Sequence, residues 1–240
     1  MSARLLALDS STDVLAVAVA GDERPWLREV QGGAAASSRI IGLALEGLAA
    51  CGLQVSQLDA VAFAAGPGAF TGLRCACAVA QGLAFAARKP VLPIDSLMVV
   101  AEAARVELGA AGSDLWATMD ARMDEIYAAH YLRDAGRWRV AVAPALYTLD
   151  ALAQRWAAAP PRALAGNAKA VFGERLQAPA AVIAPAALPR AGALLALAQR
   201  ALADGAAVDA AHALPLYLRD KVALTTAERA AARAVAAPRA

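Results

Sequence analysis

The sequence predicts an α/β protein built from two similar halves. Short apolar runs bounded by turn residues alternate with segments of helical periodicity, and the order strand-strand-strand-helix-strand-helix occurs twice along the chain. Hydrophobic residues make up 60% of the 240 residues and charged residues 18%, so the chain can bury a large core. Much of the apolar content is alanine, which suits buried and exposed helix positions alike and therefore blurs the pattern.

The first half is expected to comprise residues 1–108. Its first strand ends at the polar cluster at 9–13, and a Gly-Asp pair closes the second strand. The serines at 37–38 are plausible N-caps for the first helix, and Gly52 can take the left-handed conformation that ends it. The strands are expected at residues 5–8, 14–20, 26–30, 58–65 and 90–94, and the helices at 37–51, 71–87 and 98–108.

The second half, residues 109–223, repeats this order with little residue identity. Strands are expected at residues 116–119, 125–132, 138–142 and 162–165, and helices at 149–158 and 167–176. The duplicated order is typical of the actin, sugar-kinase and Hsp70 (ASKHA) architecture, in which two RNase H-like βββαβα halves face each other. We expect residues 212–223 to pack back on the first half, and the end rich in Ala and Arg, 224–240, to form a flexible tail.

Charge and cysteine content exclude several classes of protein. The formal net charge of +2 is too small to indicate a nucleic-acid or membrane surface by itself. The three cysteines, at 51, 75 and 77, are odd in number and lie in apolar surroundings, which favours a reduced cytoplasmic compartment. The N-terminus reaches a polar turn too early for a signal peptide, and no stretch has the roughly 20 uninterrupted apolar residues of a membrane helix.

The densest motif is the glycine loop AAGPGAFTGLR at residues 64–74, where a predicted strand runs directly into a predicted helix. Backbone N–H groups cluster at such a helix start and can bind phosphate. The loop lacks the Lys-Ser or Lys-Thr pair of a Walker A motif, and its GxGxxxG spacing is not that of a dinucleotide fingerprint. It is equally well interpreted as a tight structural turn.

The turn after the first strand offers an alternative function. In a kinase-like architecture, Asp9, Ser10 and Ser11 would approach the phosphates of a nucleotide, together with Gly66 and Gly68 of the glycine loop. The chain would then be an ATP-dependent ASKHA-type small-molecule kinase. The simpler interpretation, which we favour, is that Asp9 caps the hairpin.

The helix predicted at 71–87 is apolar around most of its circumference. Its only long polar side chains are Arg74 and Gln81, and small residues recur every four positions from Gly72 to Ala84. Such a helix must be covered on more than one side. A sheet covers one side, and the other needs either the first helix or another chain.

Metal and covalent catalysis find little support. The two histidines, His130 and His212, are far apart and show no metal-ligand spacing, and no GxSxG elbow is present. The charged segment from Asp120 to Tyr127 could perform acid–base chemistry, but a salt-bridged turn is the commoner structure for such a cluster.

Five segments together resemble one known family. LLALDSSTD, AFAAGPGAFTGLR continuing into AVAQGLAF, PIDSL, MDARMDEIYAAHY and PLYLRD are similar to the TsaB (YeaZ) family, over about residues 5–221. The family usually has Ser where this chain has Ala69. Members often carry a His just before the first helix, where this chain has only Ala and Ser at 35–38.

The resemblance implies the duplicated fold and a non-catalytic role. TsaB proteins pair with the catalytic subunit TsaD and the small ATPase TsaE, and the complex transfers threonylcarbamoyl to the adenosine beside the anticodon of ANN-decoding tRNAs. ATP and a metal are then expected in the partner subunits, with no cofactor bound firmly by this chain. TsaD-like subunits carry an HxxxH metal pair on the helix that matches residues 37–51, and this chain has no histidine there.

In the family, the first helix and the helix after the glycine loop form a surface for pairing with TsaD or for self-association. The interface residues implied here are Arg39, Ile40, Leu43, Gly47, Phe70, Thr71, Gly72, Arg74, Cys75, Ala76, Val79 and Ala80. We therefore expect a large charged residue at Ala76 or Ala80 to abolish pairing and to leave the monomer folded.

Overall fold

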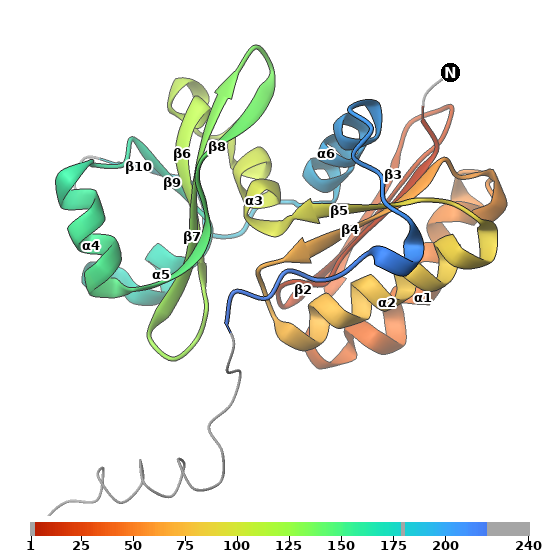
Figure 1. The fold of residues 1–240 in the computed structure, drawn as a ribbon, viewed down its shortest axis with the longest axis horizontal. Helices are drawn as coiled ribbons and strands as arrows, with labels where there is room; N and C mark the ends of the chain where they lie inside the picture. The colour runs from red at the N-terminus through yellow and green to blue at the C-terminus, as the bar shows by residue number, and fades with distance from the viewer. Residues whose placement is uncertain (1–2, 179–180, 220–240) are drawn as a thin grey trace, which may run out of the picture.

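The computed structural model describes residues 3–178 and 181–219, and Figure 1 shows two lobes side by side, each built on a five-stranded sheet. The first sheet contains β1 (Leu5–Asp9), β2 (Val14–Ala20), β3 (Trp26–Gln31), β4 (Ala60–Gly66) and β5 (Val91–Asp95). The second contains β6 (Asp114–Asp120), β7 (Glu125–Asp134), β8 (Arg137–Thr148), β9 (Ala163–Ala165) and β10 (Val182–Ile183). The predicted tail at 224–240, and residues 220–223 before it, lie outside the described residues.

The two sheets have the same topology. The strand orders are β3-β2-β1-β4-β5 and β8-β7-β6-β9-β10. In each sheet the first three strands pair antiparallel, and the last two strands run parallel to the first. The match confirms the predicted ASKHA-like fold of two RNase H-like halves.

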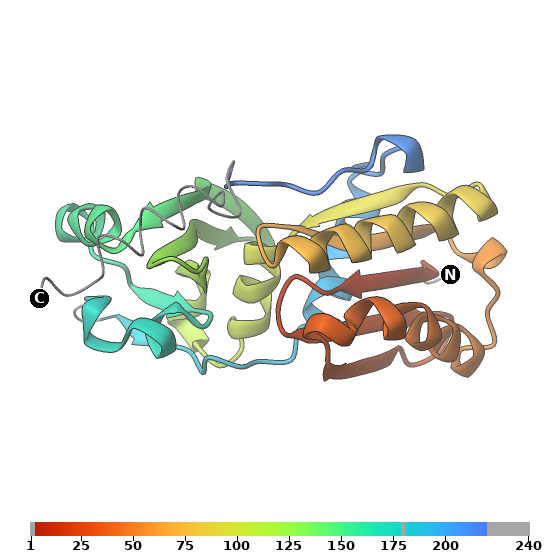
Figure 2. The same cartoon turned by 90° about the horizontal axis from the view of Figure 1, so that it is seen from below.

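The helices cover both faces of each sheet. They are α1 (Ala36–Ala50), α2 (Phe70–Ala87), α3 (Ser96–Ala104), α4 (Leu149–Ala158), α5 (Ala168–Phe172) and α6 (Ala191–Ala203). Helices α1 and α2 lie side by side on one face of the first sheet (Figure 2), and α4 and α5 pack on the second sheet. Every residue of β1 is buried, so the first sheet needs a cover on its other face as well.

Each half supplies that second cover to the other half. Leu194 and Leu195 of α6 pack with Leu5 and Leu92 of the first sheet, although α6 lies within the predicted half 109–223. Conversely, α3 follows the first sheet in the chain but packs chiefly on the second sheet, where its Leu97 is fully buried. The sequence predicted neither α6 nor β10.

A buried hydrogen bond fastens α3 to the second sheet. Asp95 caps α3 by accepting from the backbone N–H groups of Leu97 at 2.9 Å and Met98 at 3.4 Å, and Tyr131 of β7 donates to its other oxygen at 2.5 Å. Burial raises the pKa of the Asp95 carboxyl, and burial together with the Asp95 charge raises that of the Tyr131 hydroxyl. The phenol therefore stays protonated and remains a donor.

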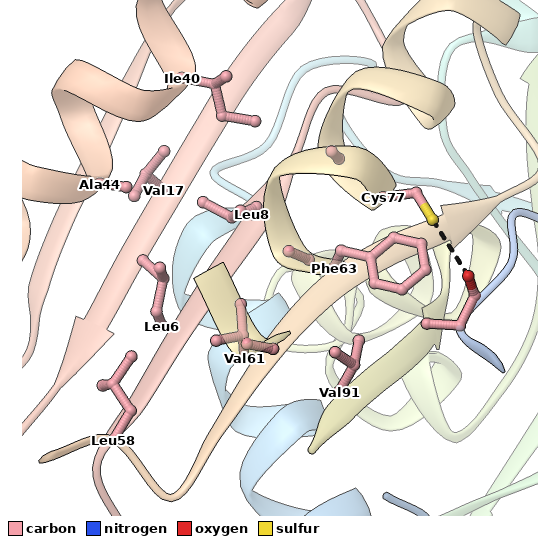
Figure 3. Packing of buried hydrophobic residues seen from close by; sticks show 14 of the residues in the cluster. Leu6, Leu8, Val17, Ile40, Ala44, Leu58, Val61, Phe63, Cys77 and Val91 are labelled. Atoms are coloured by element: carbon pink, nitrogen blue, oxygen red, sulfur yellow. Dashed lines mark hydrogen bonds between the residues drawn. The ribbon is translucent and has the colours of Figure 1, made fainter. Parts of the chain in front are cut away.

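The core of the first half lies between the sheet and helices α1 and α2. Figure 3 shows Phe63 of β4 and Leu8 of β1 packed beneath the helices, with Cys77 of α2 beside Phe63. The Cys77 thiol donates to the carbonyl of Ala213 at 3.4 Å, and burial raises its pKa. Cys77 is therefore a packing residue, as its apolar surroundings predict.

Several element ends differ from the prediction. Helix α1 begins at Ala36, and the Ser38 hydroxyl donates to the carbonyl of Ala35 and caps no N–H group. Gly52 does adopt the left-handed conformation, with φ +63°. Strand β8 extends to Thr148 because it pairs with β7 along nearly its whole length, and α3 ends at Ala104, four residues before the predicted end.

Candidate functional site

The glycine loop packs its backbone against the turn after β1. The Ser10 hydroxyl donates to the carbonyl of Gly72 at 2.7 Å, and the N–H of Ala69 donates to the carbonyl of Ser11 at 2.7 Å. A Cβ on Gly72 would overlap the carbonyl oxygen of Ser10, and one on Gly68 would lie 2.5 Å from that of Ser11. The glycines thus permit close backbone contact, and the loop serves as a tight turn that starts α2.

We expect opposite effects from alanine at the two ends of α2. Gly72→Ala should lower the free energy of unfolding by about 1–3 kcal/mol, because its methyl group meets backbone atoms that cannot move aside. Gly82→Ala should raise it by about 0.5–1 kcal/mol, because a Cβ there meets no atom within 4 Å and alanine favours the helix. Urea denaturation of both variants measures this, and equal effects would contradict the proposed role of Gly72.

Asp9 is engaged in a buried ion pair. Its carboxylate lies 2.8 Å from the guanidinium of Arg190, and the two side chains are 1% and 9% exposed. Arg190 also donates to the hydroxyls of Ser11 at 3.0 Å and Thr12 at 3.2 Å. The backbone N–H groups of Arg190 and Ala191 donate to the carboxylate of Glu29 at 2.6 and 2.8 Å. Two carboxylates of the first sheet therefore hold the start of α6.

Removing one partner of this ion pair leaves the other charge buried. Asp9→Asn and Arg190→Met should each lower the free energy of unfolding by about 3–5 kcal/mol. The double variant should lose less than the sum of the two, because it leaves no uncompensated charge. Urea denaturation of the four proteins gives the coupling energy, and simple additivity would contradict the pairing.

A cavity of about 270 Å³ lies between the two halves. It is lined by Asp13, the glycine loop, Asn167 and the segment from Asp120 to Tyr127. That segment is a salt-bridged turn. The guanidinium of Arg122 lies 3.1 Å from Asp120, and residues 122–124 all have positive φ. Among the described residues, no group of three or more His, Cys, Asp or Glu side chains could hold a metal ion.

The C-terminal segment 210–219 crosses from the first half to the second. Gln81 of α2 donates to the carbonyls of Ala210 and Ala213, both at 3.0 Å, and the N–H of Leu216 donates to the carbonyl of Ala65 at 2.7 Å. At its end, Arg219 donates to the carbonyl of Ala121 at 2.9 Å. The segment thus forms part of the cavity wall.

The outer face of α1 and α2 is apolar and exposed. Ile41 and Leu45 of α1 are 50% and 51% exposed, and Phe85 of α2 is 75% exposed. Gly42 of α1 and Gly82 of α2 are also exposed, and a Cβ added to either meets no atom within 4 Å. We call this surface, with Ala78, the α1/α2 face.

The predicted interface residues divide between this face and the core. Exposed or half-buried are Arg39, Phe70, Thr71, Arg74, Cys75 and Val79. Buried within the chain itself are Ile40, Leu43, Gly47, Gly72, Ala76 and Ala80. The small residues of the latter group let α1 and α2 approach their own sheet, as Gly47 does beneath Trp26.

The expectation for Ala76 and Ala80 therefore changes. Both are fully buried in the core of the first half, so a charge there would unfold the chain before it tested any partner surface. The exposed residues of the α1/α2 face that the predicted interface did not include are Ile41, Gly42, Leu45, Ala78, Gly82 and Phe85. A second stripe, Thr71-Cys75-Ala78-Gly82-Phe85, also has helical spacing and could have indicated them.

Comparison with known proteins gives a consistent family. The family described as TsaD: tRNA N6-adenosine threonylcarbamoyltransferase matches residues 33–227. The tRNA threonylcarbamoyladenosine biosynthesis protein TsaB of Escherichia coli (strain K12) is 30% identical over 235 residues, which is 92% of this chain and 96% of that protein. The chain belongs to the TsaB (YeaZ) family, within the wider TsaD-like family.

Two further relatives agree. The TsaB protein of Haemophilus influenzae is 42% identical over 134 residues, a match that spans only 55% of this chain and 56% of that protein. The structure of YeaZ from Pseudomonas aeruginosa superimposes with a TM-score of 0.81 at 38% identity and covers 91% of this chain and all of that one. Membership of the TsaB family groups the chain with proteins of tRNA threonylcarbamoyladenosine biosynthesis.

Helix α2 of this TsaB-family chain has the length and composition of a membrane span. The core helix of a globular protein passes the same test, and α2 packs against β4, α1 and the C-terminal segment. Its apolar composition is thus explained by contacts on its inner side and by the α1/α2 face on its outer side.

Proposed function

We propose that this chain is a non-catalytic scaffold subunit in tRNA threonylcarbamoyladenosine biosynthesis. It pairs through the α1/α2 face with a TsaD-like catalytic subunit, and the assembly works with a TsaE-like ATPase in the cytoplasm. The assembly transfers threonylcarbamoyl to the adenosine beside the anticodon of ANN-decoding tRNAs, and ATP and a metal bind to the partner subunits. The observation that carries this proposal is the exposed apolar α1/α2 face.

The chemistry of that face suits a helical partner. Large apolar side chains at Ile41, Leu45 and Phe85 are exposed to water, and their burial against another protein is favourable. Gly42 and Gly82 add no side chain to the exposed surface, so that a partner helix could approach the backbone closely at these positions. Two copies of this chain could use the same face, so the isolated protein is a candidate homodimer.

The state of Asp9 supports a non-catalytic role. A carboxylate that positions a metal-bound water or hydroxyl needs free oxygen atoms directed at the ligand. Asp9 is 1% exposed, and its charge is balanced by Arg190. The glycine loop likewise uses the N–H groups of Gly66 and Ala69 within the chain, at the Ser96 hydroxyl and the Ser11 carbonyl.

A charged side chain introduced on the α1/α2 face should abolish pairing with the TsaD-like subunit without unfolding the chain. Gly82→Arg and Ala78→Arg should weaken binding to the TsaD-like subunit by at least about 100-fold, because each buries an unpaired charge in the interface. Gly82→Arg should raise the unfolding midpoint and Ala78→Arg should leave it nearly unchanged, since arginine is a far better helix former than glycine and almost as good as alanine. Calorimetric titration gives the affinity, and Ala157→Arg on the exposed side of α4 is the matched control. Unchanged affinity in both variants would refute this surface.

Titration with ATP separates the scaffold from a kinase. We expect no binding of ATP and magnesium at Asp9 in the isolated chain, because Arg190 occupies the carboxylate that a kinase would use. Binding that was saturable and disappeared in Asp9→Asn would contradict the scaffold proposal. Inorganic phosphate under the same conditions controls for anion binding elsewhere on the chain.

A further inference from the structure

Three arginines converge on one buried carboxylate at the seam between the two halves. Glu102 comes from α3 and is 6% exposed at its side chain. Around it lie Arg105, which directly follows α3, Arg133 from β7 and Arg200 from α6, and we call these three residues the arginine cluster. Because α6 covers the face of the first sheet opposite α1 and α2, the cluster is remote from the α1/α2 face (Figure 1).

The arginines contact a single oxygen of Glu102 at long range. The nearest guanidinium nitrogens of Arg105 and Arg200 lie 3.5 Å from Oε2, and that of Arg133 lies 3.9 Å from it. The same oxygen accepts a hydrogen bond from the indole of Trp138 at 2.6 Å. The approach of three guanidiniums is therefore electrostatic, with distances too long for good hydrogen bonds.

The nitrogens that face Glu102 have no hydrogen-bond partner among the described residues. These are Nε of Arg105, Nε of Arg133 and Nη1 of Arg200, all buried. These buried nitrogens are directed at Glu102, so the donors that a ligand could reach are the other nitrogens of the three guanidiniums. The side chains are 33%, 22% and 38% exposed, so the outer edges of the guanidiniums reach solvent.

The charge count favours an anion. Three arginines and one glutamate give the cluster a net charge of +3 − 1 = +2. Arg137 and Asp204, each four residues along the chain from a member of the cluster, pair with each other at 2.7 Å and do not change this sum. Glu102 contacts the buried edges of the three guanidiniums, and the ring of Trp138 lies 5.9 Å from the Arg133 guanidinium. These contacts partly order the arginines before a ligand binds.

We propose that the arginine cluster is a phosphate-binding site, and that its phosphate belongs to an RNA backbone. Guanidinium groups offer planar pairs of N–H donors that match phosphate oxygens, and three of them on separate elements can bind one phosphate from several sides. The choice of RNA rests on the proposed function, in which the chain works on tRNA. A free phosphate or nucleotide has the same binding group and is the other source to be tested.

The test compares arginines that differ only in their position. Arg133→Gln and Arg200→Gln each remove one charge from the cluster, and Arg139→Gln removes one from the exposed opposite face of β8. Affinity for an unmodified tRNA transcript is measured by fluorescence anisotropy, at several salt concentrations, on the full chain with its TsaD-like partner. Inorganic phosphate and ATP are titrated separately into the chain alone. Arg200→Lys retains the charge and controls for misfolding, together with thermal unfolding of every variant.

Each cluster variant should weaken tRNA binding about tenfold and lower the salt dependence by about one ion. Arg139→Gln should bind as the unmodified chain does. If the cluster variants lost binding of inorganic phosphate or ATP but bound tRNA normally, the site would still bind phosphate, and the proposal that the phosphate belongs to RNA would be overturned. Unchanged binding of all three ligands would overturn the site itself. If the unaltered complex formed no threonylcarbamoyladenosine, the proposed function would fail, whereas phosphate binding by the chain would still be measurable.

Discussion

The buried ion pair between Asp9 and Arg190 is the contact on which the arrangement of the two halves depends. Asp9 ends the first strand, and Arg190 stands immediately before α6, so their pairing draws a helix of the second half onto the sheet of the first. Glu29 secures the same point through the backbone of Arg190 and Ala191. A buried ion pair adds little net stability, but either charge alone in the core is costly, and we infer that the pair disfavours arrangements in which the two residues do not meet.

A second polar contact, between Asp95 and Tyr131, holds a helix of the first half on the sheet of the second half. Asp95 caps α3 and accepts from Tyr131, and this fastens a helix of the first half onto the second sheet. The exchange of α3 and α6 means that neither sheet has a complete cover within its own half. We infer that the halves unfold together, since separating them would expose apolar faces of both sheets.

The parts of this structure that were predictable are those with strong local signals. The β1 and β2 runs, their turns, the helix that ends at Gly52 and the glycine turn before α2 follow from hydrophobic pattern and backbone chemistry. Helix α6 was missed because alanine dominates it and because Gly, Pro and Ala surround it. The partner of Asp9 could not be inferred at all, because it lies 190 − 9 = 181 residues away in sequence. Pairing over such a distance is decided by the tertiary fold.

The α2 helix shows why the predicted interface list includes buried residues as well as exposed ones. Small residues recur at helical spacing on two faces: Ala76, Ala80 and Ala84 face the sheet, while Cys75, Ala78 and Gly82 face outward. Spacing identifies a stripe but not the element that it faces, because small residues favour close approach to a sheet and to a partner helix alike. Only the burial of each residue in the folded chain separates the two stripes.

The net charge of the sequence likewise does not show where charges gather in the folded chain. The whole chain has a formal net charge of +2, from which no nucleic-acid surface was expected. The three arginines and Glu102 alone also sum to +2, so the charges of the rest of the chain cancel. Its members stand at 105, 133 and 200 and form no basic run in the sequence. Since a phosphate interacts with charges within about 10 Å at ordinary salt, local arrangement decides its binding, and a near-neutral total is compatible with a phosphate site.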